Sequence, residues 1–189
     1  CTSSRSSDSG ATPGLRTVGG SGIAEDTHPV RGLLSNRPFD ANLSDAGIAT
    51  RLRMAVIAPR ADARRVAEYL ARLHQHAQPG PSDADYLPAF PGFGAAFKCP
   101  LELPEPGLPS FVELDEPTDK SQASSRALGA RLASALASLR AGVNPSMTLI
   151  YIPTRWRELK GYETEVDKFD LHDFVKSAAI PLGCSTQFL

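Results

Sequence analysis

Continuous apolar runs separated by polar segments mark out the chain from residue 51 onward. The runs in RLRMAVIAPR (51–60) and MTLIYIP (147–153) predict strands that are buried on both faces of a sheet. FVELDEP (111–117) is a further candidate strand, and a last strand is expected at residues 185–189.

Between these strands, apolar residues recur at helical spacing. A first helix is expected after Pro59, ending before Gly80, and a second over residues 119–141, stopped by Gly142. A third is expected from Asp167 to Ala179. The apolar positions that predict them are Val66, Leu70, Leu73 and Ala77, then Leu128, Leu132, Ala135, Leu136 and Leu139, then Leu171, Phe174, Val175, Ala178 and Leu182. Strands alternating with helices predict an α/β fold, a Rossmann-like parallel sheet flanked by helices.

The chain divides into three predicted parts. Residues 1–27 are rich in Ser, Gly and Thr and predict a disordered N-terminal leader. Residues 28–50 are a linker segment, with one strand or extended stretch over 28–39, and residues 51–189 are the α/β domain. The chain lacks an initial Met and stops inside the last predicted strand, so we expect a fragment whose domain is truncated at its C-terminal side.

Composition narrows the function classes. The formal net charge is −1, which argues against binding nucleic acid by bulk electrostatics and would confine such a role to a focused site. The three cysteines, Cys1, Cys99 and Cys184, are scattered and predict neither a disulfide framework nor a metal site, as expected in a reducing cytoplasm. No apolar run is long enough to predict a membrane span.

The candidate site lies at the end of the chain. His172 and Lys176 are four residues apart, so they project from one side of the last helix, and Gln187 follows on the next strand. A helix N-terminus at the carboxyl edge of a sheet offers N–H groups and a positive dipole end to a phosphate. On spacing alone, a His and a Lys on an amphipathic helix are more often a solvated face than a binding site.

A second group follows the strand at 147–153. Arg155, Trp156 and Arg157 are expected at the carboxyl edge of the sheet, where ligands bind, and are candidates for additional nucleic-acid contacts. The other interpretation of Trp156 is packing against the last helix.

The spacing His172-x3-Lys176-x10-Gln187, with its flanks YIPTRW and FDLHDFVK…TQFL, resembles the MID domain of prokaryotic Argonaute proteins in its histidine–lysine variant. HPVRGLL…RPF, RLRMAVIAP and FPGFGAAF resemble the linker and upstream parts of the same region, so the resemblance covers roughly residues 28–189. It implies that the three side chains hold the 5′ phosphate of a guide strand. His172 would contact the phosphate and stack on the first base, Lys176 would neutralise its charge, and Gln187 would hydrogen-bond it.

The resemblance also implies partners and role. The expected partners are a guide oligonucleotide, RNA or DNA, and its complementary target, in cytoplasmic, nucleic-acid-guided defence without a membrane. The chain contains neither a PIWI nuclease domain nor a recognisable PAZ region, so it is not expected to be an enzyme; for the full-length protein that question stays open. No cofactor or metal ligand is expected within the chain. A divalent cation such as Mg²⁺ at the phosphate pocket is expected only in the complete protein, as is a further phosphate-binding lysine.

Two alternatives remain open at this stage. One is an α/β domain that binds a small phosphorylated metabolite. The other is a non-catalytic Argonaute module that regulates an associated effector protein.

Overall fold

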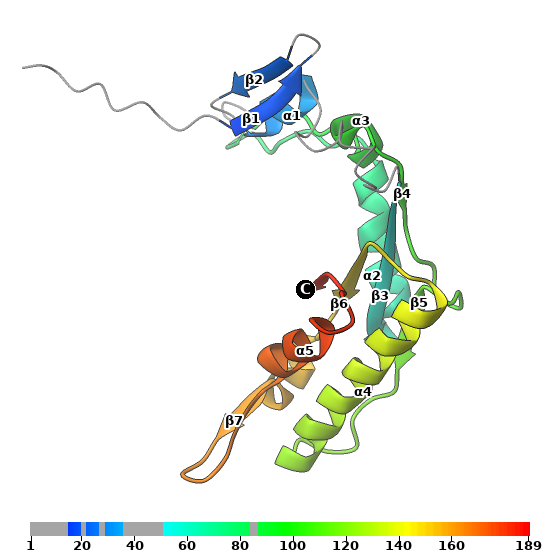
Figure 1. Ribbon diagram of the computed structural model, residues 1–189, viewed down its shortest axis with the longest axis vertical. Helices are drawn as coiled ribbons and strands as arrows, with labels where there is room; N and C mark the ends of the chain where they lie inside the picture. The colour runs from blue at the N-terminus through cyan, green and yellow to red at the C-terminus, as the bar shows by residue number, and fades with distance from the viewer. Residues whose placement is uncertain (1–14, 20–21, 27–28, 36–50, 84–86) are drawn as a thin grey trace, which may run out of the picture. The chain divides into compact units, whose positions relative to one another are not determined.

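The computed structural model describes residues 15–19, 22–26, 29–35, 51–83 and 87–189 (Figure 1). They belong to two compact units. The first combines the chain up to Ile48 with His76–Lys98, and the second combines Ala49–Gln75 with Cys99–Leu189.

The first unit contains short elements. Strands β1 (Leu15–Gly19) and β2 (Gly22–Asp26) pair antiparallel, so the described part of the predicted disordered leader forms a hairpin instead. The predicted strand or extended stretch at 28–39 is also wrong where it is described, because Pro29–Ser35 forms helix α1. Proline is favoured at a helix start, since its ring fixes φ and its missing N–H would be unpaired there anyway. The rest of the linker, residues 36–50, lies outside the described residues.

Helix α3 (Phe93–Phe97) completes the description of this unit. The rings of Phe93 and Phe97 stack with their centroids 4.4 Å apart, as their four-residue spacing predicts. Phe90 lies outside the helix and pairs with Ala77 in an isolated antiparallel bridge.

The second unit is built on a parallel sheet whose central strand is β3 (Leu52–Pro59). On one side β3 pairs with β6 (Met147–Ile150), and β6 pairs with the edge strand β9 (Thr186–Phe188). On the other side it pairs with β4 (Leu101–Glu102) and β5 (Phe111–Leu114). The predicted α/β fold with a parallel sheet is therefore confirmed, and only the two-residue β4 was not expected.

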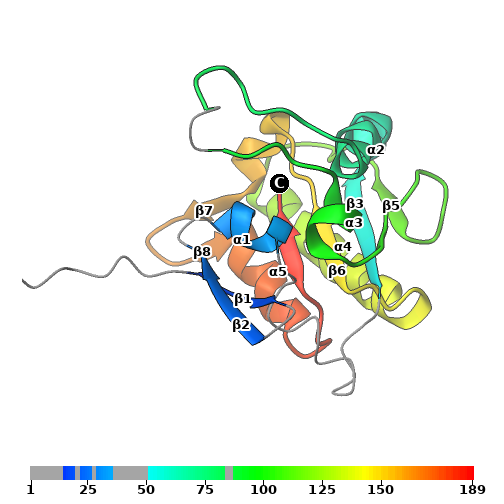
Figure 2. The ribbon, with the colours of Figure 1, turned by 90° about the horizontal axis from the view of Figure 1, so that it is seen from above.

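Helices cover both faces of this sheet (Figure 1). Ile57 and Ile150 are buried in one core cluster with the leucines of α4 (Gln122–Gly142) and with Val175 of α5 (Leu171–Ala179). Neighbouring strand residues point to opposite faces, so Val56 and Leu149 face the other side, which α2 (Ala63–Ala71) covers. Figure 2 shows β9 running beside α5 toward the C-terminus.

Several predicted boundaries change. Helix α2 ends at Ala71 and continues only as a 3-10 turn over Arg72–His74, short of the predicted Ala77. The segment between the predicted strand at 147–153 and the predicted third helix holds the 3-10 helix η5 (Thr154–Leu159) and strand β7 (Gly161–Glu163), which pairs antiparallel with β8 (Lys168–Asp170). Because β8 occupies residues 168–170, α5 begins at Leu171 rather than at Asp167.

Candidate functional site

Helix α5 is held against the sheet by one apolar stripe. Leu171, Val175 and Ala179 recur every four residues and are buried, which leaves His172 exposed and Lys176 half-buried on the adjoining side. The helix begins with a side-chain cap, because the carboxylate of Asp170 accepts the N–H of Asp173 at 2.9 Å.

Strand β9 presents backbone groups beside this helix. Ser185 and Leu189 bond to β6, through Thr148 N–H to Ser185 O at 2.8 Å and Leu189 N–H to Ile150 O at 2.9 Å. Alternate residues of a strand direct their backbone groups to opposite sides, so the groups of Thr186 and Phe188 point away from β6. Among the described residues, no strand pairs with that outer edge.

Two of the three side chains predicted to bind phosphate, Lys176 and His172, contact β9, and the third, Gln187, belongs to it. The Nζ of Lys176 donates a hydrogen bond to the carbonyl of Thr186, and the Nε2 of Gln187 donates to the carbonyl of Phe188 at 3.1 Å. The two carbonyls are two residues apart, or about 7 Å along the strand. The ring of His172 lies against that of Phe188, with centroids 5.0 Å apart.

Gln187 does not share a face with His172. Its Cα is in register with Leu149, on the α2 side of the sheet, whereas Phe188 is in register with Ile150 on the α5 side. The donors of Lys176 and Gln187 therefore approach the outer edge of β9 from opposite faces. A phosphate bound there would replace two backbone carbonyls as their acceptor.

The start of α5 is less open to an anion than the sequence predicted. The N–H of Asp173 is capped, and that of Leu171 donates to the carbonyl of Lys160 at 2.8 Å. Asp173 Oδ1 lies 3.3 Å from Nδ1 of His172, so a carboxylate competes for the imidazole.

Ligand atoms of Asp170, His172 and Asp173 all lie within 4.8 Å of one another. Carboxylate oxygens are ligands that suit Mg²⁺. Asp170 already serves as the helix cap, however, and exposed acidic groups are common without an ion. We therefore assign no metal to the group.

The structure corrects the prediction for Trp156. Its ring is 2% exposed within the core cluster, which also contains Leu171 and Val175 of α5, so it cannot stack on a base. Packing, the other interpretation of this residue, is confirmed. The Nε1 of Trp156 donates a hydrogen bond to Glu116 Oε2 at 2.6 Å. Arg157, the third residue of the predicted group, is exposed.

Arg155 belongs to a charged network at the carboxyl edge of the sheet. Its guanidinium lies 2.5 Å from Glu116 Oε1 and 2.6 Å from Oδ2 of the buried Asp62, whose Oδ1 pairs with Arg65 at 2.9 Å. The Arg155 guanidinium holds the pKa of Glu116 below its usual value, and the Trp156 N–H acts in the same direction against the opposing effect of burial. Glu116 and Asp62 raise the pKa of Arg155 in turn.

Sequence reasoning missed Asp62, Arg65 and Glu116, because only the fold brings them to Arg155. The available signal was position, since Glu116 closely follows β5, Arg155 follows β6, and Asp62 follows β3. The pairings put Arg65 and Arg155 against carboxylates, which leaves Arg155 engaged rather than directed at a ligand.

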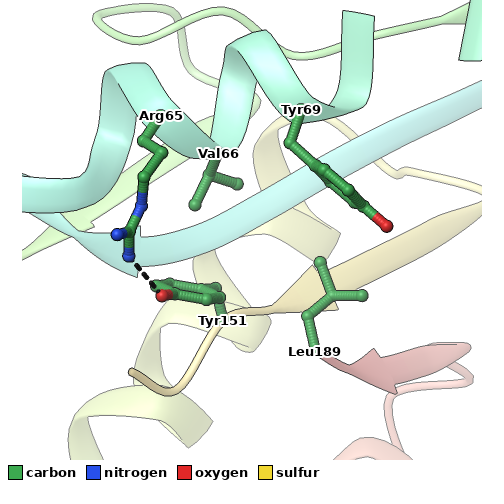
Figure 3. Close-up of a pocket in the computed structure, with 5 residues that line it drawn as sticks. All are labelled: Arg65, Val66, Tyr69, Tyr151 and Leu189. Carbon is green, nitrogen blue, oxygen red and sulfur yellow. Dashed lines mark hydrogen bonds between the residues drawn. The ribbon is translucent and has the colours of Figure 1, made fainter. Parts of the chain in front are cut away.

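A pocket of about 390 Å³ opens beside this network (Figure 3). Helix α2 contributes Arg65, Val66 and Tyr69, while Tyr151 and Leu189 follow the ends of β6 and β9. Figure 3 shows the α2 side chains directed toward Tyr151 and Leu189 across this space. No local sequence motif marks the pocket, because its walls come from three segments that are far apart in the chain.

Fold and site together define a parallel α/β domain with polar side chains gathered around its edge strand. Comparison of the sequence with protein-family models and with curated proteins finds no match. None of the helices in the described ranges is long and apolar enough to cross a membrane.

Proposed function

We propose that the second unit is an Argonaute MID-like domain that binds the 5′ phosphate of a guide oligonucleotide at the outer edge of β9. One observation carries the proposal: Lys176 and His172 of α5 both contact the short strand that carries Gln187, so the residues of the sequence pattern meet at one edge of the sheet. The role that follows is recognition within nucleic-acid-guided defence, with no chemical step assigned to these residues.

Binding would exchange acceptors at this edge. Lys176 would leave the carbonyl of Thr186 for a phosphate oxygen, a charge-assisted hydrogen bond that is stronger than one to a neutral carbonyl. The amide of Gln187 would make the same exchange from Phe188. Water can satisfy the carbonyl of Phe188, which is half-buried at an edge that faces no described strand, whereas Thr186 is buried and its released carbonyl reduces the gain.

His172 would serve the first base. Its ring is exposed, and one side of it contacts Phe188. The opposite face is suited to stacking, which is tolerant of base identity. Asp170 and Asp173 oppose phosphate binding by charge, so the two acidic side chains set a limit on affinity.

Fluorescence anisotropy with labelled oligonucleotides tests the proposal. Wild-type chain should bind a 5′-phosphorylated guide more tightly than the same guide with a 5′-hydroxyl, and Lys176→Ala should remove the difference. Lys168→Ala is the matched control, because Lys168 is an exposed lysine of the same unit that pairs with Glu163 instead. Equal affinity for the two guides, or equal loss in both lysine variants, would contradict the phosphate site.

A second arm uses the acidic side chains. Asp173→Asn should tighten binding of the phosphorylated guide about two- to five-fold, the effect of removing one exposed repulsive charge. The 5′-hydroxyl guide should be unaffected. A free mononucleotide that binds as tightly as the oligonucleotide would favour a metabolite-binding domain instead.

A further inference from the structure

We propose that the pocket between α2 and the ends of β6 and β9 binds a planar aromatic ring of the nucleobase class. This site is separate from the edge of β9 to which Lys176 donates, and it goes beyond the 5′-phosphate function. The inference holds whether or not the α5 side chains bind a phosphate.

The position of the pocket is the first argument. From β3 the chain passes to β5 on one side of the sheet and then returns to β6 on the other, so the carboxyl ends of β3 and β6 flank a topological switch point. Open α/β sheets bind ligands in the crevice at this point. Tyr151 follows β6, and α2 with Arg65 and Tyr69 follows β3 after a single 3-10 turn.

The lining chemistry is the second argument. Tyr69, Tyr151, Val66 and Leu189 give the pocket a mainly apolar wall with two aromatic rings, and its volume of about 390 Å³ falls in the range of small-molecule sites. Tyr69 is 59% exposed, so a large aromatic side chain here faces solvent rather than a core. A flat ring stacked on it would remove that surface from water.

Tyr151 is held in place for such a contact. Arg65 donates to its hydroxyl at 2.5 Å, and the guanidinium carbon lies 5.8 Å from the centroid of the same ring. Arg65 is held in turn by an ion pair with Asp62, in which Nη2 of Arg65 lies 2.9 Å from Oδ1 of Asp62. A side chain positioned by these contacts loses little freedom when a ligand stacks on it.

The charge balance favours a ring over an anion. Arg65 carries the one formal charge among the five described lining residues, and the buried Asp62 balances it. Recognition would therefore rest on the face of the ring, and stacking of this kind discriminates little between bases.

Ligand-observed NMR with adenosine, a base without a phosphate, tests the site on the whole chain. Adenosine should bind and ribose should not. Tyr69→Ala should weaken adenosine binding about five-fold or more, the loss typical of one stacking side chain, whereas Tyr69→Phe should keep it. Because Tyr69 is exposed, the alanine variant should unfold at the temperature of the wild type.

The outcomes separate the two sites. Retention of adenosine binding in Lys176→Ala, with loss in Tyr69→Ala, supports the pocket even if 5′-phosphate discrimination fails. Loss in Lys176→Ala with retention in Tyr69→Ala would place the base at α5 and overturn the inference, as would ribose binding equal to adenosine. Unchanged adenosine affinity in Tyr69→Ala, or no adenosine binding at all, would also overturn it.

Discussion

At the scale of single residues, Lys176 and Gln187 protect an exposed strand edge. Each donates to a carbonyl of β9 that points away from the sheet. An uncovered edge is a template for unwanted pairing with other chains, and lysine at the edge is a common defence. The same side chains can therefore stabilise the free domain and remain available for an anion, since a phosphate replaces two weak acceptors rather than breaking a core contact.

Another residue-scale feature gives a pH prediction at the start of α4. The carboxylate of Asp119 accepts hydrogen bonds from Ser121 and Ser124, which lower its pKa to about 2 from a usual value of 3.8. The folded chain thus keeps Asp119 ionised at pH values where the unfolded chain begins to protonate it. Its contribution to stability is complete above the unfolded value and is lost as the pH falls from 3.8 toward 2.

An NMR titration of the Asp119 carboxyl should show this low pKa directly. Ser124→Ala should raise it, because the hydroxyl bond of 2.6 Å is lost. Ser125→Ala is the control, since the Ser125 hydroxyl donates to the Ser121 carbonyl instead. A wild-type pKa near 3.8, or equal shifts in both variants, would contradict the assignment.

At the scale of elements, the β7–β8 hairpin is fastened to α4. Arg126 of α4 donates to both carboxylate oxygens of Asp167, at 2.7 and 2.8 Å, and to the hydroxyl of Tyr162 at 2.6 Å. Tyr162 and Phe169 stack with centroids 5.9 Å apart beneath the Arg126 guanidinium. The hairpin leads directly into α5, so its position also fixes the start of the helix that carries His172.

Gly161 is the tightest position of this hairpin. A Cβ added there would lie 2.7 Å from the backbone oxygen of Phe169, which cannot rotate away. Gly161→Ala should therefore lower the free energy of unfolding by about 1–3 kcal/mol, the usual cost of overpacking. Chemical denaturation measures the change.

Gly142→Ala is the matched control for that measurement. A Cβ at Gly142, the last residue of α4, meets nothing within 4 Å. It should be neutral or stabilise the chain by up to about 1 kcal/mol through helix propensity. Equal effects of the two substitutions would show that contact with Phe169 is not what requires glycine at Gly161.

The elements differ in how far the sequence predicts them. Strands β3 and β6 were predictable because strands buried on both faces read as unbroken apolar runs, and α4 because its leucines repeat over many turns. Strands β4 and β7 have two and three residues, too few to show a period, and their pairing depends on tertiary contacts.

The candidate site was predictable only in part. The shared helix of His172 and Lys176 follows from their local spacing, but the sheet face that Gln187 occupies depends on strand register, which spacing does not give.

At the scale of the whole molecule, the main core cluster of the described residues lies in the second unit. The described residues of its main cluster run from Ala55 and Ile57 through α4 to Ala179, and all lie within Ala49–Gln75 or Cys99–Leu189. The cluster packs against the face of the sheet that α4 and α5 cover, so it supports the helix that carries His172 and Lys176. Contiguous apolar burial of this kind is the main source of stability, so the unit should not need residues 1–48 to fold.

A chain that begins at Ala49 and ends at Leu189 tests this independence. It should unfold in one cooperative thermal transition by circular dichroism, because the cluster around Leu132 and Ile150 is intact. Leu132→Ala should cost about 2–5 kcal/mol in this shorter chain and the same amount in the full one, since its buried neighbours are identical. A shorter chain that melts without cooperativity, or a smaller Leu132→Ala effect in it than in the full chain, would mean that residues 1–48 contribute to the core around the sheet.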